Sequence, residues 1–187
     1  LFCGRLIEKK GLPDAIRAIK LVKQRLAGRP VQLRVIGSGA LRPSIESVIG
    51  SEGLTQEVLL LGAQPHSVFL SELGQADVVL QPSRVAGDGD DEGGAPTALI
   101  EAQACGVPVI STWHADIPEV VRDGQTGLLV QEGNVEAMAD HLLALAQDAT
   151  LRRRLGQEGR RHIETNYHIE TQMMELERIY DECSRER

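Results

Sequence analysis

The 187-residue chain is 42% apolar and 25% charged but only 3% aromatic, so Val, Ile, Leu and Ala must build its core, as in a covered α/β sheet. This length fits one domain that buries about two thirds of the surface of its unfolded chain. The formal charge of −7, from 20 basic and 27 acidic side chains, argues against a broad basic surface for nucleic acid or anionic lipid.

Strand-like and helix-like segments alternate along most of the chain, the pattern of parallel strands joined by helical crossovers. The first strand ends at residues 1–3, and Pro13 suits the first turn of the helix that follows. Further strands are predicted at residues 31–36, 58–61, 76–80, 107–111 and 127–130. Further helices are predicted at residues 42–49, 67–74, 97–105, 118–122 and 135–147. We therefore expect a doubly wound α/β fold with a parallel sheet of about six strands and helices on both faces.

From residue 151 onward the chain carries helix signals alone, first a charged helix and then a second one at residues 169–183. Apolar residues recur at helical spacing in the second helix: Met173, Leu176, Ile179 and Tyr180. We expect both helices to pack outside the sheet.

Cys3, Cys105 and Cys183 lie far apart and form no CxxC pair, which favours a reducing, cytoplasmic compartment over a disulfide framework or a metal site. No apolar run approaches the length of a membrane span, and the start lacks a basic segment followed by an apolar one. The chain begins without Met and directly in a strand, so we expect it to be part of a longer protein.

Ligands of open parallel sheets bind beyond the carboxyl ends of the strands, where three loops of this chain stand out. The first is the basic loop, residues 4–11, with the sequence GRLIEKKG. Arg5 offers a fixed fork of donors and Lys10 a mobile charge, and together they could hold a diphosphate. A solvated charged loop explains the same spacing equally well.

The second is the glycine turn, residues 36–43, with the sequence IGSGALRP. It resembles half of a dinucleotide fingerprint, but the third glycine and an acidic ribose-binding residue are both missing, which argues against a nicotinamide cofactor. Gly37 and Gly39 allow close approach of a ligand to the backbone. A tight turn alone would also explain them.

The third is the long loop, residues 82–96, which ends in small residues that lead into a predicted helix: Gly93, Gly94, Ala95, Pro96 and Thr97. Unpaired backbone amides at this helix start could point at phosphate or sugar oxygens. Glu92 precedes the helix and Glu101 follows its first turn, and carboxylates accept hydrogen bonds from sugar hydroxyls. Each glutamate on its own is more typical of an ordinary surface.

Five segments resemble, in order, those of the retaining GT-B glycosyltransferases related to glycogen synthase and to bacterial polysaccharide assembly enzymes. They are GRLIEKKG, VIGSGALRPSIE, ADVVLQPS, EGGAPTALIEAQACGVPVIST and IPEVVRDGQTGLLV. The resemblance covers nearly the whole chain. It implies that residues 1–187 are the C-terminal nucleotide-sugar-binding domain, one Rossmann-like half of a GT-B fold. It also implies that the last helix, about residues 168–184, crosses to an N-terminal acceptor-binding domain, although this helix could instead pack on its own sheet.

The resemblance implies transfer of a hexosyl group, with retention, from a UDP- or GDP-linked sugar to a sugar or lipid-linked acceptor. The implied catalytic residues are Arg5, Lys10 and Glu92, and the implied donor-binding residues are Gly37, Gly39, Gly93, Gly94, Ala95, Pro96, Thr97 and Glu101. No metal or other cofactor is expected, because cations and helix amides can stabilise the departing diphosphate. We expect no transmembrane segment and no nucleic-acid partner, with any contact with the inner membrane face made by the N-terminal half.

The chain departs from the family pattern at two places. Glu92 and Glu101 are nine positions apart, where the family usually has eight. We attribute this to one extra residue within Gly93, Gly94 and Ala95, which leaves the ribose role of Glu101 intact. The second departure is Ala115 and Asp116, where the family often has small, glycine-rich residues.

Other functions stay open at this stage. The five histidines are scattered, and His114 is the only one near an expected site loop. No GxSxG segment follows a strand, so a serine nucleophile is unsupported. A GT-B sugar-nucleotide epimerase would share the fold and the donor, and a regulatory domain that binds a nucleotide sugar without catalysis would share the site.

Overall fold

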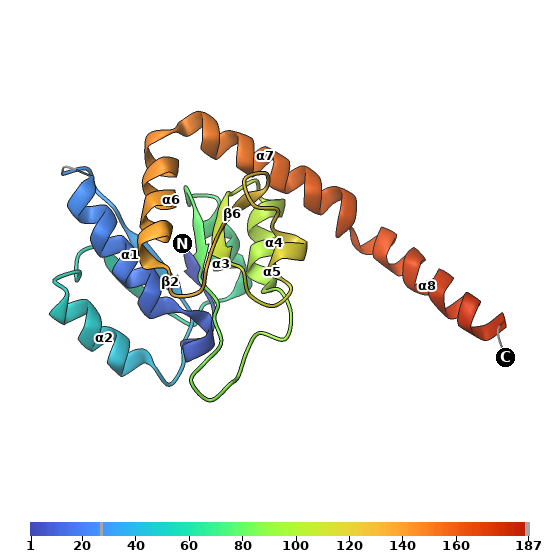
Figure 1. Cartoon of the computed structure of the whole chain (residues 1–187), viewed down its shortest axis with the longest axis horizontal. Coiled ribbons are helices and arrows are strands. Elements are labelled where there is room, and N and C mark those ends of the chain that lie inside the picture. The colour runs from blue at the N-terminus through green and yellow to red at the C-terminus, as the bar shows by residue number, and fades with distance from the viewer. Residues whose placement is uncertain (27, 186–187) are drawn as a thin grey trace.

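The computed structural model describes residues 1–26 and 28–185. Its strands form two three-stranded parallel sheets, with the orders β1-β2-β3 and β4-β5-β6 (Figure 1). The first sheet consists of β1 (Phe2–Cys3), β2 (Leu33–Ile36) and β3 (Val58–Gly62). The second consists of β4 (Val79–Gln81), β5 (Val109–Thr112) and β6 (Gly127–Val130).

The two sheets meet edge to edge at β1 and β4. The Leu80 N–H donates to the Leu1 carbonyl at 2.9 Å, and the Leu1 amino group donates to the Val78 carbonyl at 2.8 Å. The spatial order is therefore β3-β2-β1-β4-β5-β6. From β1 the first half of the chain adds strands toward one edge, and from β4 the second half adds strands toward the other edge. This is the doubly wound arrangement that the sequence predicts, and it creates a switch point at the β1/β4 junction.

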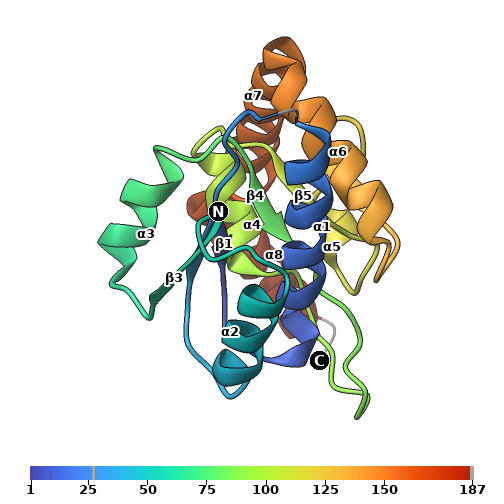
Figure 2. The same ribbon diagram turned by 90° about the vertical axis from the view of Figure 1, so that its left-hand side faces the viewer.

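Helices cover both faces of the sheets. The helical elements among the described residues are the 3₁₀ turn η1 (Glu8–Lys10) and the helices α1 (Leu12–Arg25), α2 (Arg42–Ser51), α3 (His66–Leu73), α4 (Thr97–Ala104), α5 (Ile117–Val120), α6 (Val135–Gln147), α7 (Ala149–Asn166) and α8 (Ile169–Arg185). α1 and α6 lie side by side on one face (Figure 2), and α4 packs against α7 on the other. The basic loop contains η1, which sequence reasoning treated as irregular.

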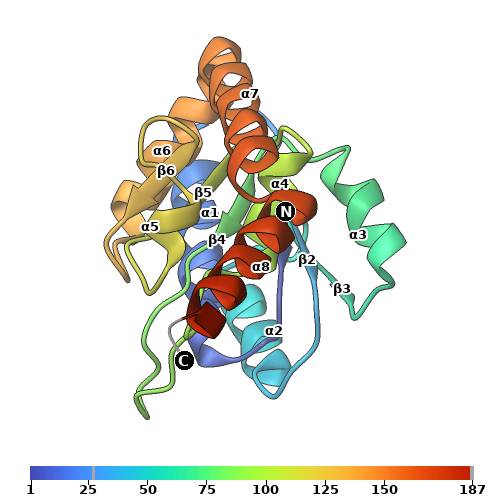
Figure 3. The same cartoon turned by 90° about the vertical axis from the view of Figure 1, so that its right-hand side faces the viewer.

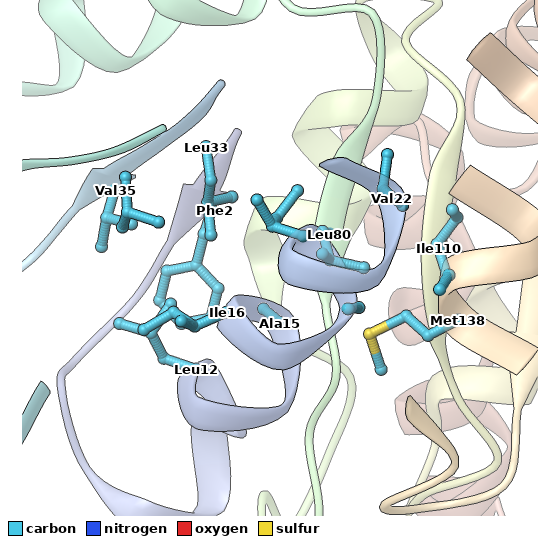
Figure 4. Close-up of a cluster of buried hydrophobic side chains, with 14 of the residues drawn as sticks. Phe2, Leu12, Ala15, Ile16, Val22, Leu33, Val35, Leu80, Ile110 and Met138 are labelled. Atoms are coloured by element: carbon cyan, nitrogen blue, oxygen red, sulfur yellow. The ribbon is translucent and has the colours of Figure 1, made fainter. Parts of the chain in front are cut away.

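Each face has its own hydrophobic core. The core under α1 and α6 joins Phe2, Leu12, Ile16, Leu80 and Met138 (Figure 4). The core under α3, α4 and α5 joins other fully or nearly buried side chains: Phe69, Leu73, Leu99, Val109 and Ile117. Aliphatic residues fill both cores, as the composition predicts.

Local signals explain several element boundaries. The Asn134 side chain caps the start of α6 by accepting a hydrogen bond from the Ala137 N–H. Asp148 caps the start of α7 by accepting hydrogen bonds from the N–H groups of Thr150 and Leu151. The predicted strand at residues 76–80 is shifted, because β4 begins at Val79, where it pairs with Val109 of β5. The predicted strand at residues 31–36 begins at Leu33, which pairs with Val58.

The last two helices differ in packing. α7 lies outside the sheet and packs on α4, as predicted. α8 buries none of its residues and extends away from the body of the domain in Figure 1, so that it points toward the viewer in Figure 3. It therefore lies outside the sheet, as expected, but does not pack there, and the alternative that it packs on its own sheet is wrong. No helix among the described residues has the length and apolar character of a membrane span.

Candidate functional site

The three loops chosen from the sequence converge at the carboxyl ends of the strands, with the basic loop in the middle. The Leu6 N–H donates to the Ser38 carbonyl at 2.9 Å, which ties the basic loop to the glycine turn. The Arg84 N–H donates to the Lys9 carbonyl at 2.9 Å, which ties the basic loop to the long loop. The long loop, green in Figure 1, extends beyond the strand ends.

A buried ion pair lies between the basic loop and the long loop. Lys10 Nζ donates to Glu92 Oε2 at 2.7 Å, and the two side chains are only 13% and 6% exposed. Ser83 Oγ donates to Glu92 Oε1 at 2.6 Å. Burying two charges is costly, and it is tolerated here because both carboxylate oxygens accept hydrogen bonds. Two of the predicted catalytic residues, Lys10 and Glu92, are thus in direct contact.

Arg5, the third predicted catalytic residue, lies exposed on the basic loop. The neighbouring Lys9 Nζ donates to Asp90 Oδ1 at 2.8 Å. This hydrogen bond, helped by the charges of Lys9 and Arg5, lowers the pKa of Asp90. Lys9 and Lys10 of the basic loop are therefore paired with the acidic segment of the long loop, and Arg5 acts on it through its charge.

The structure explains why glycine is needed at both positions of the glycine turn, which the sequence alone did not predict. Gly37 has a φ of +142°, and a Cβ there would lie 1.8 Å from the Gly4 carbonyl oxygen. A Cβ at Gly39 would lie 2.5 Å from the Leu6 carbonyl oxygen. Both glycines are needed so that two backbones can touch. Their predicted contact with a ligand stays a prediction.

The glycines before α4 are in open space instead. A Cβ at Gly93 would have only Asp91 Oδ1 nearby, at 4.0 Å, and one at Gly94 only Asp116 Oδ2, at 3.8 Å. α4 begins after Pro96, and no side chain caps its first turn. The predicted donor-binding run from Gly93 through Ala95 to Thr97 therefore leaves the first amides of α4 without a side-chain acceptor.

Glu101 lies on α4 and faces the start of α3. Its Oε1 is 3.1 Å from His66 Nε2, and its side chain is 37% exposed. Burial, with the nearby Glu101 carboxylate as the second cause, raises the pKa of the Cys3 thiol to about 11. Glu101 thus stands by the carboxyl end of β1, within reach of a ligand at the switch point.

His114, Glu132 and Ser83 complete the surroundings of Glu92. The Glu92 N–H donates to His114 Nε2 at 3.3 Å, and His114 Nδ1 is 2.7 Å from Glu132 Oε1. Sequence reasoning noted the position of His114 but gave it no role, and it missed Ser83 and Glu132. Both residues lie two or three positions after a predicted strand, and this position was a usable signal for each.

This arrangement suits an anionic ligand that also carries hydroxyl groups. Cations and unoccupied helix amides bind phosphate, and the carboxylates of Glu92 and Glu101 accept hydroxyl donors. Across residues 1–26 and 28–185, no group of three or more His, Cys, Asp or Glu side chains is placed to hold a metal ion.

Known proteins are similar to this chain in sequence and in fold. The family model described as "Glycosyl transferases group 1" matches residues 1–162. The amylovoran biosynthesis glycosyltransferase AmsK of Erwinia amylovora is 41% identical over 147 residues, which cover 79% of this chain and 35% of AmsK. A GDP-mannose-dependent monoacylated alpha-(1-6)-phosphatidylinositol monomannoside mannosyltransferase of Corynebacterium glutamicum is 33% identical over 165 residues, covering 88% of this chain and 42% of that protein.

A solved structure supports the fold assignment. Anabaena HepE in complex with UDP superposes with a TM-score of 0.84 at 18% identity, over 97% of this chain and 48% of HepE. This chain spans less than half the length of each of these three proteins. The match to the family model over most of the chain, with the identity to AmsK, leads to one conclusion: the chain belongs to the glycosyl transferases group 1 family.

Proposed function

We propose that this chain supplies the donor site of a retaining glycosyltransferase, which transfers a hexosyl group from a nucleoside-diphosphate sugar to a sugar or lipid-linked acceptor. The observation that carries the proposal is the cluster of Lys10, Glu92 and Ser83 beside the uncapped start of α4. The relatives support the substrate class, since one is named for amylovoran biosynthesis, one for GDP-mannose, and one was solved with UDP. The donor would be a UDP- or GDP-linked sugar.

In this proposal the diphosphate lies between Arg5, Lys10 and the first amides of α4. Negative charge grows on the departing diphosphate as its bond to the anomeric carbon breaks. Cations and amides that bind this charge more strongly than the ground state lower the barrier. They supply the positive field without a metal ion, so a divalent cation would not be required.

Glu92 changes partner when the donor binds. In this structure Lys10 is paired with Glu92, so a diphosphate must compete for the same ammonium group. Once Lys10 turns to phosphate, Glu92 is free to accept a hydrogen bond from a sugar hydroxyl, with Ser83 still holding its other oxygen. Glu101 would accept from the ribose hydroxyls.

The acceptor would bind to an N-terminal domain that faces this chain across a cleft, in the cytoplasm. Without that domain the acceptor hydroxyl is not held near the anomeric carbon, and the contribution of proximity, roughly 7 to 11 kcal/mol, is lost. The 187-residue chain should therefore bind a donor and transfer no sugar. The exposed apolar side of α8 is consistent with a crossing to such a domain.

Calorimetric titration of this chain tests the proposal. UDP, GDP and their hexose derivatives are compared, each with and without chelator, and one donor is expected to bind equally well in both conditions. Glu101→Ala should weaken binding of both the free nucleoside diphosphate and the nucleotide sugar, while Glu92→Ala should weaken binding of the nucleotide sugar alone. Glu158→Ala, which removes an ion pair with Arg161 within α7, is the control. Absence of binding by every nucleotide would overturn the donor site, and donor epimerisation without acceptor would favour an epimerase.

A further inference from the structure

A chain of hydrogen bonds runs from β6 to the backbone of Glu92. Glu132 lies two positions after the end of β6, His114 lies two positions after the end of β5, and Glu92 lies on the long loop. Glu132 Oε1 is 2.7 Å from His114 Nδ1, and the Glu92 N–H points to His114 Nε2 at 3.3 Å. His114 is only 4% exposed, so solvent does not compete for either of its ring nitrogens.

The partners fix the protonation state that this arrangement needs. Nε2 accepts the Glu92 N–H and therefore carries no proton, so the proton of a neutral ring sits on Nδ1 and is donated to the Glu132 carboxylate. The second oxygen, Glu132 Oε2, accepts the Val85 N–H at 2.9 Å. Two backbone amides near opposite ends of the long loop, those of Val85 and Glu92, thus depend on the same pair of side chains.

Glu132 is suited to this role because it stays ionised. Partial burial raises its pKa, but the hydrogen bonds from Val85 and His114, together with the positive charge of Arg84, outweigh burial and leave the pKa below its ordinary value. An ionised carboxylate accepts at both oxygens and donates at neither, so it can hold two N–H donors at once.

We propose that Glu132 and His114 are positioning residues for the long loop, which set the backbone at Glu92 and thereby keep its carboxylate at the sugar position. The stem of this loop has separate anchors, because Ser111 Oγ donates to the Gln81 carbonyl at 2.5 Å and Thr112 Oγ1 donates to the Ser83 carbonyl. His114 and Glu132 act beyond the stem. The inference rests on the proposed function, since it assigns to Glu92 the contact with the donor sugar.

Two substitutions of His114 separate the two hydrogen bonds. His114→Gln places an amide oxygen near the Nε2 position and keeps an acceptor for the Glu92 N–H. His114→Asn places an amide N–H near the Nδ1 position, keeps a donor for Glu132 and loses that acceptor. Glu132→Gln is a second route, because a neutral amide of the same shape retains one acceptor oxygen and can satisfy only one of its two partners.

The first measurement is amide hydrogen exchange of the long loop in this chain, which needs no ligand. His114→Asn should speed exchange at Glu92 by about tenfold, the equivalent of one hydrogen bond, while His114→Gln stays near wild type. Asp148→Ala is the control, since it removes the cap of α7, which lies 16 residues after Glu132, and should lower the melting temperature by a loss of helix capping alone. Unchanged exchange in His114→Asn and Glu132→Gln, or equal loss in both His114 variants, would overturn the positioning role.

The second measurement is donor affinity. His114→Asn should weaken binding of the nucleotide sugar by about threefold to tenfold and leave the free nucleoside diphosphate within about twofold, with rescue by His114→Gln. A wild-type chain that binds no nucleotide sugar would defeat the proposed function, and the exchange measurement would still decide the positioning role. A donor-binding chain in which all three variants bind as wild type would defeat the positioning role alone.

Discussion

The glycine turn and the long loop flank the same basic loop, yet they are held by different kinds of contact. The glycine turn is fixed by backbone touching backbone, with Gly37 against Gly4 and Gly39 against Leu6. The long loop also begins with a backbone contact, since a Cβ at Gly11 would lie 1.8 Å from the Pro82 carbonyl oxygen, but Glu92 further along is held by side chains, with Lys10 on its carboxylate and His114 on its N–H. Backbone contacts leave no room for change, whereas a ligand can take over a side-chain contact. We therefore call the glycine turn, residues 36–43, the rigid wall of the site and the part of the long loop around Glu92 the adjustable wall.

The strongest test of the rigid wall is Gly37→Ala. Its Cβ would lie 1.8 Å from the Gly4 carbonyl oxygen, at a φ of +142° that side-chain-bearing residues avoid. We expect a loss of about 3 kcal/mol or more in the free energy of unfolding, from combined clash and backbone strain. Chemical denaturation measures it.

Gly50→Ala is the matched control for that test. It lies within α2, and a Cβ there meets nothing within 4 Å. Alanine should therefore stabilise the chain by about 0.5 to 1 kcal/mol. If the two variants unfolded alike, the close approach at Gly37 would not be what holds the glycine turn.

The adjustable wall is tested by Lys10→Met, which removes the ammonium group and keeps most of the side-chain volume. Binding of a nucleoside diphosphate should weaken by about 1.5 to 3 kcal/mol, the range for hydrogen bonds to charged groups. Lys9→Met is the control, because it removes a neighbouring cation of the same charge whose partner, Asp90, is 56% exposed. Calorimetry compares the two, and equal losses would mean that total charge, and not Lys10 itself, binds the diphosphate.

A smaller effect is expected at Ala115, in the turn that carries His114 beside the adjustable wall. Ala115 is the non-glycine residue found at positive φ in the described chain, at 44°. Ala115→Gly should raise the free energy of unfolding by about 0.5 to 1 kcal/mol, since relief of strain exceeds the added freedom of the unfolded chain. Ala144→Gly, exposed within α6, should instead lower it by about 1 kcal/mol. A loss in both variants would contradict strain at Ala115, which would then need a local contact that favours its alanine.

The sequence predicted those elements whose ends depend on local signals. The ranges of β6 and α6 agree with the predicted ones, and for α6 the reason is visible, because Asn134 caps its start. β4 was misplaced because its extent depends on pairing with β5, far along the chain. For α8 the sequence left two packing surfaces open for a similar reason, since an apolar stripe indicates a partner but not which surface supplies it.

The site was predictable to the level of loops. Position after a strand and residue type were enough to choose the basic loop, the glycine turn and the long loop. The pairing of Lys10 with Glu92 joins residues 82 positions apart, and no pattern in a single sequence encodes such a contact. The close approach of Gly37 to Gly4 was equally out of reach, because it depends on how two strands align in the sheet.

Because β1 and β4 meet edge to edge, the Lys10–Glu92 pair also links the two sheets to each other. Lys10 follows a strand of one sheet and Glu92 follows a strand of the other, so the pair fastens the two sheets at their carboxyl ends, while the bonds of Leu1 fasten them at the opposite end. If the proposed phosphate draws Lys10 away, this side-chain link between the two sheets is lost, while the backbone hydrogen bond from the Arg84 N–H to the Lys9 carbonyl remains. The same ammonium group therefore contributes both to binding the ligand and to linking the two sheets.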